Sequence, residues 1–359
     1  MTAPLIIAEA GVNHNGDLGM AKEMVRSAAN AGADAVKFQS FRADKLATKD
    51  ARKAAYQNRA DTAGESQHAM LCELELSEDA HLELRDLCKD LGIEFMSTAF
   101  DDDLLWFLVN SCRIRRVKIP SGEAANPLFL LSAAATELPI IMSTGMCTLD
   151  DVERALGVLA FAMTRSSGAE PGETAFAAAA ASPEGKMRLA ERVTLLHCTS
   201  SYPADVSDAN LAAMKTLADA FGLPVGYSDH TQGVAVSIAA AALGATVIEK
   251  HFTMDRSLPG PDHAASIEPA DLADLVIGVR AAVAAIGSPG KRPTADEQDT
   301  MAVARRSLVA ARPIAKGEAF STENLTAKRP GGGVDPYSYW AMLGQPANRS
   351  YDADEVIDP

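Results

Sequence analysis

The fold of this chain is decided by three short runs: VTLLHCTS at 193–200, PVGYSDH at 224–230 and TVIEKHF at 246–252. Each is rich in apolar and β-branched residues and then ends in polar or charged residues, which is typical of buried parallel strands. Ala- and Leu-rich segments of helical period lie between them, and GLP at 222–224 and GA at 244–245 mark returns to a strand. The stretch therefore predicts consecutive βα units.

Runs of the same kind precede it along the chain. They are LIIAEAG at 5–11, AVKFQS at 35–40, IEFMSTAF at 93–100, RRVKIPSG at 115–122 and LPIIMSTG at 138–145. Eight units that end near Ile286 predict an α/β fold of the (β/α)8 TIM barrel type, which needs about 250 residues. A doubly wound sheet is the alternative, but such sheets usually have fewer units and a Gly-rich GxGxxG turn, which AEAGVNHNGDLG at 8–19 is not.

The remaining segments define the domain organisation. We expect a barrel domain over 1–286, a linker over 287–298, and a small β-rich domain over 299–359 with short strands and several Gly and Pro residues. Within the barrel, 43–76 forms a long excursion that suits a lid or a subunit contact. The Ala-rich segment 164–192 is expected to be an insertion.

Composition limits the classes of function. Of the 359 residues, 47% are hydrophobic and 23% charged, and the net charge is −15, which disfavours binding to nucleic acid or to anionic lipid. No apolar run reaches the ~20 residues of a transmembrane helix, and the N-terminal segment lacks a basic leader. Five scattered cysteines form neither a disulfide framework nor a zinc motif. We therefore expect a cytoplasmic enzyme with reduced thiols.

Polar residues stand at the end of almost every predicted strand. In a TIM barrel these ends form one face, which is where the active site lies. A single such residue is commonly a helix cap or a loop hydrogen bond, but a full set on one face indicates a site. The set is Glu9, Lys37, Gln39, Ser97, Thr98, Lys118, Ser121, Ser143, Thr144, Thr199, Ser200, Ser228, Asp229, His230, Glu249 and His251.

Two cations within this set predict an anion pocket. Lys37 and Lys118 occupy strand positions where packing would favour Val or Ile. The alternative, that both side chains extend to solvent and bind no anion, is the weaker interpretation. Ser121, Ser143 and Ser228 supply hydroxyl donors beside the two lysines. Gly122 and Gly145 permit the backbone N–H groups to approach a ligand closely. Such a pocket fits a phosphorylated or carboxylated small molecule.

Two histidines at neighbouring strand ends predict a metal site. His230 and His251 are accompanied by no cysteine ligand, which suits a divalent ion such as Mn²⁺, with Mg²⁺ or Co²⁺ as alternatives. Glu249 lies two residues before His251 and so shares its face of the strand, where it could orient a ligand or contact the substrate. His14 and His263 fall in candidate loops, whereas His197 is expected to be structural.

The motifs, in order and spacing, resemble the sialic acid synthase family. They are AEAGVNHNG, KFQ, STAFD, KIPSGE, MSTGM, HCTSSYP, GYSDHT, EKHFT and LPGPDHAAS, and the segment around LVAARPIAKGEAFSTENLTAKRPGGG resembles the family's antifreeze-like (SAF) domain. The resemblance spans nearly the whole chain. It implies condensation of phosphoenolpyruvate with a 2-acetamido hexose to a nine-carbon acid and phosphate. It also implies a domain-swapped homodimer, with one chain's small domain over the partner's barrel mouth.

The resemblance also implies roles for individual residues. The metal ligands are His230 and His251. The phosphoenolpyruvate contacts are Lys37, Thr98, Lys118, Ser121, Ser143, Ser200 and Ser228. The amino-sugar contacts are Glu9, Gln39, Tyr202, Asp262 and, from the partner chain, Arg329. Where the family has Asn, this chain has Ser200, whose shorter side chain calls for a bridging water. We take Glu9, Lys37, Lys118, Glu249 and Asp262 as the candidate catalytic residues.

The implied reaction begins with attack of C3 of phosphoenolpyruvate on the open-chain aldehyde and ends with C–O cleavage and loss of phosphate. We expect Glu9 to act as the general base toward water, with metal-bound water as the alternative. A Schiff base on Lys37 is the weaker enzymatic interpretation. The chain could also be a pseudaminate-type or different phosphoenolpyruvate-dependent sugar-acid synthase, or a non-catalytic sugar-binding relative. The substrate expected here is N-acetylmannosamine or 2,4-diacetamido-2,4,6-trideoxymannose.

Overall fold

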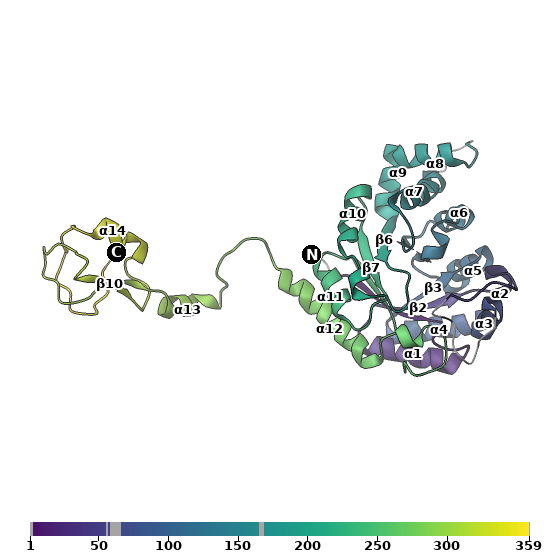
Figure 1. Ribbon diagram of the computed structural model, residues 1–359, viewed down its shortest axis with the longest axis horizontal. Coiled ribbons are helices and arrows are strands. Elements are labelled where there is room, and N and C mark those ends of the chain that lie inside the picture. Colours follow the sequence, from purple (N-terminus) through teal and green to yellow (C-terminus); the bar gives the residue numbers. More distant parts are fainter. Residues whose placement is uncertain (1–2, 55–56, 58–65, 165–168, 359) are drawn as a thin grey trace. The chain divides into compact units, whose positions relative to one another are not determined.

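The computed structural model describes residues 3–54, 57, 66–164 and 169–358. The chain divides into two units, Met1–Gly287 and Ser288–Pro359. In the first unit, helices surround a central set of parallel strands, as Figure 1 shows. Among the described residues, no helix combines the length and the apolar character needed to cross a membrane.

The strands of the first unit form one parallel sheet in the order β3-β2-β1-β8-β7-β6-β5-β4. The end strands β3 and β4 contact each other, which closes the sheet into an almost complete barrel. The predicted (β/α)8 barrel is therefore confirmed. The strands are β1 (Leu5–Gly11), β2 (Ala35–Ser40), β3 (Glu94–Ala99), β4 (Val117–Ile119), β5 (Ile140–Ser143), β6 (Val193–Cys198), β7 (Val225–Asp229) and β8 (Val247–His251).

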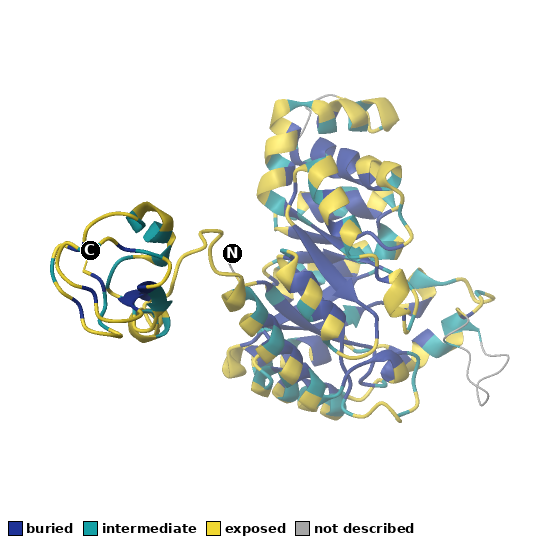
Figure 2. Cartoon of the chain, turned by 60° about the vertical axis from the view of Figure 1, so that its left-hand side comes forward, coloured by how far each residue is buried: buried dark blue, intermediate teal, exposed yellow. Residues whose placement is uncertain are grey.

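The helices lie on the outer face of the sheet with their apolar sides inward, and Figure 2 shows the contrast between exposed helix surfaces and buried strands. Sequence signals set their ends: the Ser77 hydroxyl accepts from the backbone N–H of Ala80 where α4 begins, and Gly92 ends α4 in the left-handed conformation. The helices are α1 (Leu18–Asn30), α2 (Ala43–Leu46), α3 (Gln67–Leu74), α4 (Glu78–Leu91), α5 (Asp102–Phe107), α6 (Pro127–Ala135), α7 (Leu149–Thr164), α8 (Glu173–Ala181), α9 (Pro183–Arg192), α10 (Ala212–Phe221), α11 (Ala235–Ala242) and α12 (Pro269–Ile286).

The structure adds detail to two predicted segments, and a third is shorter than predicted. The excursion 43–76 contains α2 and α3, although 55–56 and 58–65 lie outside the described residues. The insertion 164–192 contains α8 and α9, which pack on α7. The run at 115–122 contributes only three strand residues, because the polypeptide turns into a 3-10 helix at Ser121 soon after Pro120.

The second unit is small and built around an antiparallel pair, β9 (Ser307–Ala310) and β10 (Leu325–Lys328), with α13 (Glu297–Ala304) before it and α14 (Tyr339–Met342) after. Its core includes Leu308, Ile314 and Tyr351. The helix α13 overlaps the end of the predicted linker. The carboxylate of Glu297 accepts from the backbone and hydroxyl of Thr294, a T-x-x-E pattern that favours a helix start.

Inside the barrel, one apolar layer closes the end at which the strands begin. Its side chains pack on one another and come from Ile7, Ala35, Met96, Ile141, Leu196 and Val247. Gly226 of β7 lies among them, since a Cβ there would stand 2.5 Å from the Val247 carbonyl oxygen and 2.7 Å from Leu196 Cδ2. The glycine is therefore required by the packing of its neighbours.

This packing gives a stability prediction. We expect Gly226→Ala to lower the free energy of unfolding by about 1–3 kcal/mol, because the added methyl overpacks a dense interior. The matched control is Gly122→Ala, whose Cβ would meet nothing within 4 Å and should change stability by less than about 0.5 kcal/mol. Urea unfolding monitored by circular dichroism measures both. Equal effects of the two substitutions would contradict the prediction.

Candidate active site

A polar layer lies directly above the apolar layer in the barrel. Successive residues of a strand point to opposite faces, so the residue two positions after each apolar one also faces inward. In this chain that residue is polar or a cysteine on six strands: Glu9, Lys37, Thr98, Ser143, Cys198 and Glu249. Ser228 takes the same place on β7, two positions after Gly226, and Lys118 of β4 joins the layer through its contact with Glu249. Since all strands are parallel, these side chains meet at the carboxyl end of the barrel.

Four buried charged groups form the centre of this layer. Lys37 Nζ lies 2.5 Å from Glu9 Oε2 and 3.7 Å from Glu249 Oε2. Lys118 Nζ lies 3.4 Å from Glu249 Oε1. Each of the four residues is at most 4% exposed. Glu249 therefore bridges the two ammonium groups, and Glu9 pairs with Lys37 alone.

The two carboxylates differ in acidity because their surroundings differ. Burial raises the pKa of Glu9 to about 7, although Lys37 opposes the shift. Burial also acts on Glu249, but Lys118 and Lys37 outweigh it and hold its pKa at about 2. Burial lowers the pKa of Lys118, whereas in Lys37 the attraction of Glu249 and Glu9 exceeds the effect of burial and the pKa is raised. Two carboxyl groups of one site thus have separate roles: Glu249 is a permanent anion and Glu9 can exchange a proton near neutral pH.

Hydroxyl groups surround the ammonium groups. Lys37 Nζ donates to Thr98 Oγ1 at 3.1 Å, and Lys118 Nζ donates to Ser143 Oγ at 2.8 Å. Ser228 Oγ donates to Glu249 at 2.9 Å. These contacts bring together four of the residues that the sequence assigned to an anion pocket, namely Lys37, Lys118, Ser143 and Ser228.

A second group of hydroxyls lies where β4, β5 and β6 end. Ser121 Oγ accepts from the backbone N–H of Gly145 at 3.0 Å and lies 3.3 Å from Cys198 Sγ. A Cβ at Gly145 would stand 2.3 Å from Ser200 Oγ, so only glycine permits this approach. Gly122, by contrast, faces open space and is required by no contact within the described part of the chain. Cys198 was not identified as a site residue from the sequence, although its position two residues after Leu196 predicts an inward side chain.

The two histidines stand side by side, and Tyr202 packs on both. The ring centroids of His230 and His251 are 5.4 Å apart, and the Tyr202 ring lies 4.2 Å from His230 and 5.5 Å from His251. Gln39 Nε2 donates to Glu9 Oε1 at 3.3 Å, and His251 Nδ1 lies 3.9 Å from Asp262 Oδ2. Gln39 therefore contacts the charged centre directly, and Tyr202 and Asp262, the other predicted sugar contacts of the barrel domain, lie beside His251.

The donor set fits a divalent metal ion in part. His230 Nδ1 donates to the Thr199 carbonyl oxygen at 2.7 Å, which leaves the other ring nitrogen as a lone-pair donor. His251 Nδ1 is buried and has no hydrogen-bond partner among the described residues. Burial lowers the pKa of both imidazoles, and the neutral form is the one that binds metal. The part of the chain that the structure describes contains no cluster of three or more His, Cys, Asp or Glu ligands, so substrate and water would have to complete the coordination.

An ion pair behind the sheet holds the turn that carries His230. Lys250 and Asp229 are almost completely buried, with Nζ and Oδ2 3.0 Å apart, and Lys250 also donates to the Thr231 carbonyl oxygen. Asp229 accepts from the backbone and hydroxyl of Thr231 and from Ser237 Oγ at 2.6 Å. Sequence reasoning placed Asp229 among the strand-end residues and missed Lys250, although a lysine between the inward residues Glu249 and His251 must point outward.

The remaining predicted residues lie outside the charged centre. Arg329 is an exposed residue of the second unit, and its role at a barrel mouth stays a prediction. His197 is half-buried and bonds through Nε2 to the Ala209 carbonyl oxygen, as expected of a structural histidine. His14 and His263, predicted in loops, are fully buried, and Asn15 Oδ1 lies 3.1 Å from His263 Nε2.

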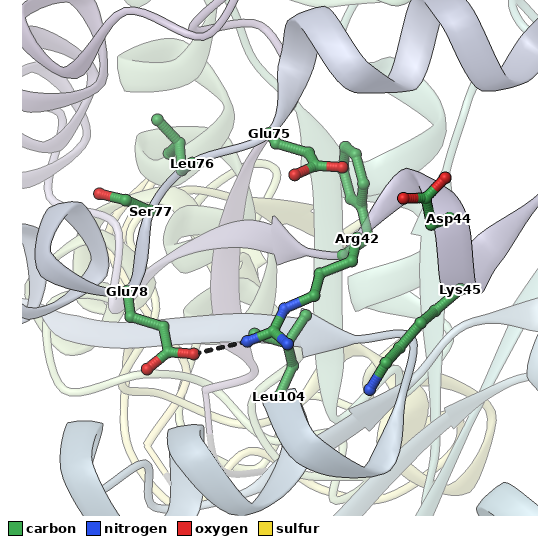
Figure 3. A pocket seen from close by; sticks show the side chains of 9 residues that line it. Arg42, Asp44, Lys45, Glu75, Leu76, Ser77, Glu78 and Leu104 are labelled. Carbon is green, nitrogen blue, oxygen red and sulfur yellow. Dashed lines mark hydrogen bonds and ion pairs between the residues drawn. The ribbon is translucent and has the colours of Figure 1, made fainter.

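A cavity of about 570 Å³ lies beside α2 and the start of α4, and Figure 3 shows its walls. Its lining residues are Phe41, Arg42, Asp44, Lys45, Glu75, Leu76, Ser77, Glu78 and Leu104. Arg42 donates to Glu78 across it at 2.7 Å. None of the lining residues belongs to the charged centre, so this cavity is separate from the candidate active site.

Comparison with known proteins identifies the family. The NeuB family model matches residues 24–291 and the SAF domain model matches 305–359. The chain is 46% identical to the N,N'-diacetyllegionaminic acid synthase of Legionella pneumophila, over 98% of this chain and 92% of the relative. It is 45% identical to the synthase of the same name from Campylobacter jejuni, over 99% of each chain.

A solved structure gives the same result at the level of the fold. It is the N-acetylneuraminic acid synthetase of Leptospira borgpetersenii, crystallised with citrate, which is 31% identical and superposes with a TM-score of 0.65 over 84% of this chain and 90% of that one. The barrel with its polar carboxyl end, the small C-terminal unit and these matches agree, and the chain belongs to the NeuB family of enzymes of the sialic acid synthase type, with a C-terminal SAF domain.

Proposed function

We propose that this enzyme condenses phosphoenolpyruvate with 2,4-diacetamido-2,4,6-trideoxymannose to a nine-carbon legionaminic-type acid and phosphate. The observation that carries the proposal is the buried pair of ammonium groups, Lys37 and Lys118, at a barrel mouth lined by hydroxyls. The choice of sugar rests on the relatives named as N,N'-diacetyllegionaminic acid synthases. N-acetylmannosamine is the second candidate, favoured by the likeness to a solved N-acetylneuraminic acid synthetase.

The hydrogen-bond donors of the site account for binding of an anion. Lys37 and Lys118 supply two buried ammonium groups, and the hydroxyls of Thr98 and Ser143 accompany them. Phosphoenolpyruvate carries a phosphate and a carboxylate, and ammonium and hydroxyl donors bind such groups through charge-assisted hydrogen bonds. The low dielectric of the buried site strengthens these interactions and stabilises phosphate as it leaves.

The bond changes follow from the reactivity of the enol. The C3 carbon attacks the aldehyde carbon of the open-chain sugar, and the π pair of that C=O bond moves to oxygen, which takes up a proton and becomes a hydroxyl. The C2 carbon gains positive character that the anionic Glu249 stabilises. Water adds at C2 while Glu9 accepts its proton, for which a pKa of about 7 is well suited. The bond from C2 to the bridging oxygen then breaks as a C=O bond forms at C2, and the proton of the C2 hydroxyl passes to the phosphate, which leaves from the donors of Lys37 and Lys118.

His230 and His251 would hold a divalent ion, which supplies Lewis acidity toward the sugar aldehyde when bound. Other residues of this chain orient the two imidazole rings. Asp229 and Lys250 fix the turn at His230, and Tyr202 packs against both rings. Mn²⁺ is our preferred ion because the protein donors are imidazoles and the remaining ligands are oxygens.

The identity of the substrates is tested by phosphate release with bridge-¹⁸O-labelled phosphoenolpyruvate. We expect turnover with 2,4-diacetamido-2,4,6-trideoxymannose to exceed turnover with N-acetylmannosamine and with the altrose isomer. The released phosphate should contain the label, because C–O cleavage leaves the bridging oxygen on phosphorus. Label retained in the organic product would mean attack at phosphorus and would contradict the roles of Glu9, Lys37 and Lys118. Preference for the altrose isomer would instead favour a pseudaminate-type activity.

Metal dependence is tested by chelation and direct binding. Removal of divalent ions should abolish turnover and added Mn²⁺ should restore it. His251→Ala should weaken Mn²⁺ binding, measured by electron paramagnetic resonance of free Mn²⁺, by at least about tenfold. His197→Gln, a change of a histidine outside the site, is the matched control and should bind Mn²⁺ normally. Full turnover in excess chelator would overturn the metal assignment.

A site shared between subunits is tested by complementation. The proposal places Arg329 of one chain at the barrel mouth of a second copy, as in a domain-swapped homodimer. Lys118→Ala and Arg329→Ala should each be inactive alone, and a mixture should recover activity because some sites then contain both residues. A mixture that remains inactive after verified subunit exchange would show that Arg329 does not act across subunits.

A further inference from the structure

A chain of three titratable side chains connects α2 and α3, outside the candidate active site. Asp44 of α2 and His68 of α3 lie with Oδ1 and Nε2 2.8 Å apart. Cys72 stands one turn after His68 on α3, with Sγ 3.7 Å from His68 Nδ1. The opposite side of α3 packs Leu71 and Leu74 into a cluster with Phe41 and Ala43 of the barrel rim, which fixes the helix in place.

The chemistry of the three groups decides where the protons lie. The Asp44 carboxylate can only accept, so His68 Nε2 carries a hydrogen and donates it. In the neutral imidazole, Nδ1 then has a lone pair directed at the thiol, and Cys72 is the donor. A nucleophile, a base and a group that orients the base therefore stand in line, as in activated-thiol sites.

The position of Cys72 on α3 does not by itself supply a base or an anion-stabilising helix end. Cys72 lies in the last turn of α3, where the helix dipole disfavours an anion. The charged residues of α2 and α3 are two carboxylates and one ammonium group, Asp44, Glu73 and Lys45. The activation that the observed geometry supplies is proton transfer to His68, whose Nδ1 is aligned with the sulfur.

Both ends of this three-residue chain are open to small molecules. The Cys72 side chain is exposed and that of His68 is 16% exposed. Asp44 lines the cavity of about 570 Å³ and stands at its edge beside Lys45 in Figure 3. The other four cysteines are Cys88, Cys112 and Cys198, which are buried, and Cys147, which is half-buried. An oxidised Cys72 would therefore lack an exposed cysteine in this protein with which to form a disulfide.

We propose that Cys72 is a peroxide-reactive thiol activated by His68 and oriented through Asp44. The thiol proton passes to His68 Nδ1, and the thiolate sulfur attacks one oxygen of a hydroperoxide. The S–O bond forms as the O–O bond breaks, so sulfur is oxidised by two electrons and the peroxide is reduced. The departing hydroxide or alkoxide takes the proton from His68, which yields a sulfenic acid and water or an alcohol.

The test is the rate of sulfenic acid formation in the full chain. The protein is treated with hydrogen peroxide and dimedone, and the adduct at Cys72 is measured by peptide mass spectrometry with Cys147 as the internal reference. Cys72 should react faster than Cys147. His68→Gln keeps a donor for Asp44 but removes the base, and it should slow the reaction of Cys72 by about tenfold or more.

Asp44→Ala, which removes both the charge and the acceptor, separates the proposal from simple electrostatics. Loss of a nearby negative charge alone would favour the thiolate and speed the reaction, whereas loss of the orienting acceptor should slow it about threefold. Glu73→Gln is the matched control, since it removes a carboxylate beside Cys72 that does not contact His68, and it should not slow the reaction. Equal thermal unfolding midpoints verify that the variants are folded. Unchanged reactivity in His68→Gln, or acceleration in Asp44→Ala, would overturn the proposal.

Discussion

The arrangement of the candidate active site depends on two ammonium groups held inside a barrel. Lys37 and Lys118 are each 3% exposed, and a lone buried charge is strongly unfavourable. Glu249 lies within 3.7 Å of both and is the only group that joins them among the ion pairs of the described residues. Removal of one partner from such a buried pair typically costs about 3–5 kcal/mol, since it leaves the other charge uncompensated. A barrel selected for stability alone would not contain this cluster.

The barrel accommodates these buried charges because its interior has two layers, one apolar and one polar. The strands begin with apolar inward residues such as Ile7 and Val247, and two positions later the same faces present Glu9 and Glu249. The lower layer supplies the packing and excludes water from below, while the upper layer faces the open end where substrates enter. The Asp229–Lys250 pair lies behind the sheet, where it stabilises the turn at His230 without adding charge to the site.

Much of this could be predicted from the sequence because strand periodicity is local. A run such as TVIEKHF specifies both a buried strand and the shared face of Glu249 and His251. Prediction from the sequence fails where a contact joins residues that are far apart in the chain. The contact of Lys250 with Asp229 requires the register of β7 against β8, and the contact of Ser121 with Cys198 joins residues 77 positions apart. The shortened β4 depends on the turn after Pro120, which strand propensity does not describe.

The thiols show why surroundings decide chemistry more than residue type does. Cys198 lies in the active site beside Ser121, yet burial raises its pKa and no base is aligned with it among the described residues, so it acts as packing and as a weak hydrogen-bonding group. Cys72 lies on a solvent-exposed helix with no contact to the charged centre in the described part of the chain, yet an imidazole is aligned with its sulfur and a carboxylate with that imidazole. Asp44 and His68 are 24 residues apart and meet only because α3 packs on the barrel rim. Tertiary packing therefore assembles both the polar layer of the barrel and the group formed by Asp44, His68 and Cys72, which lies on the excursion that follows the strand of Lys37.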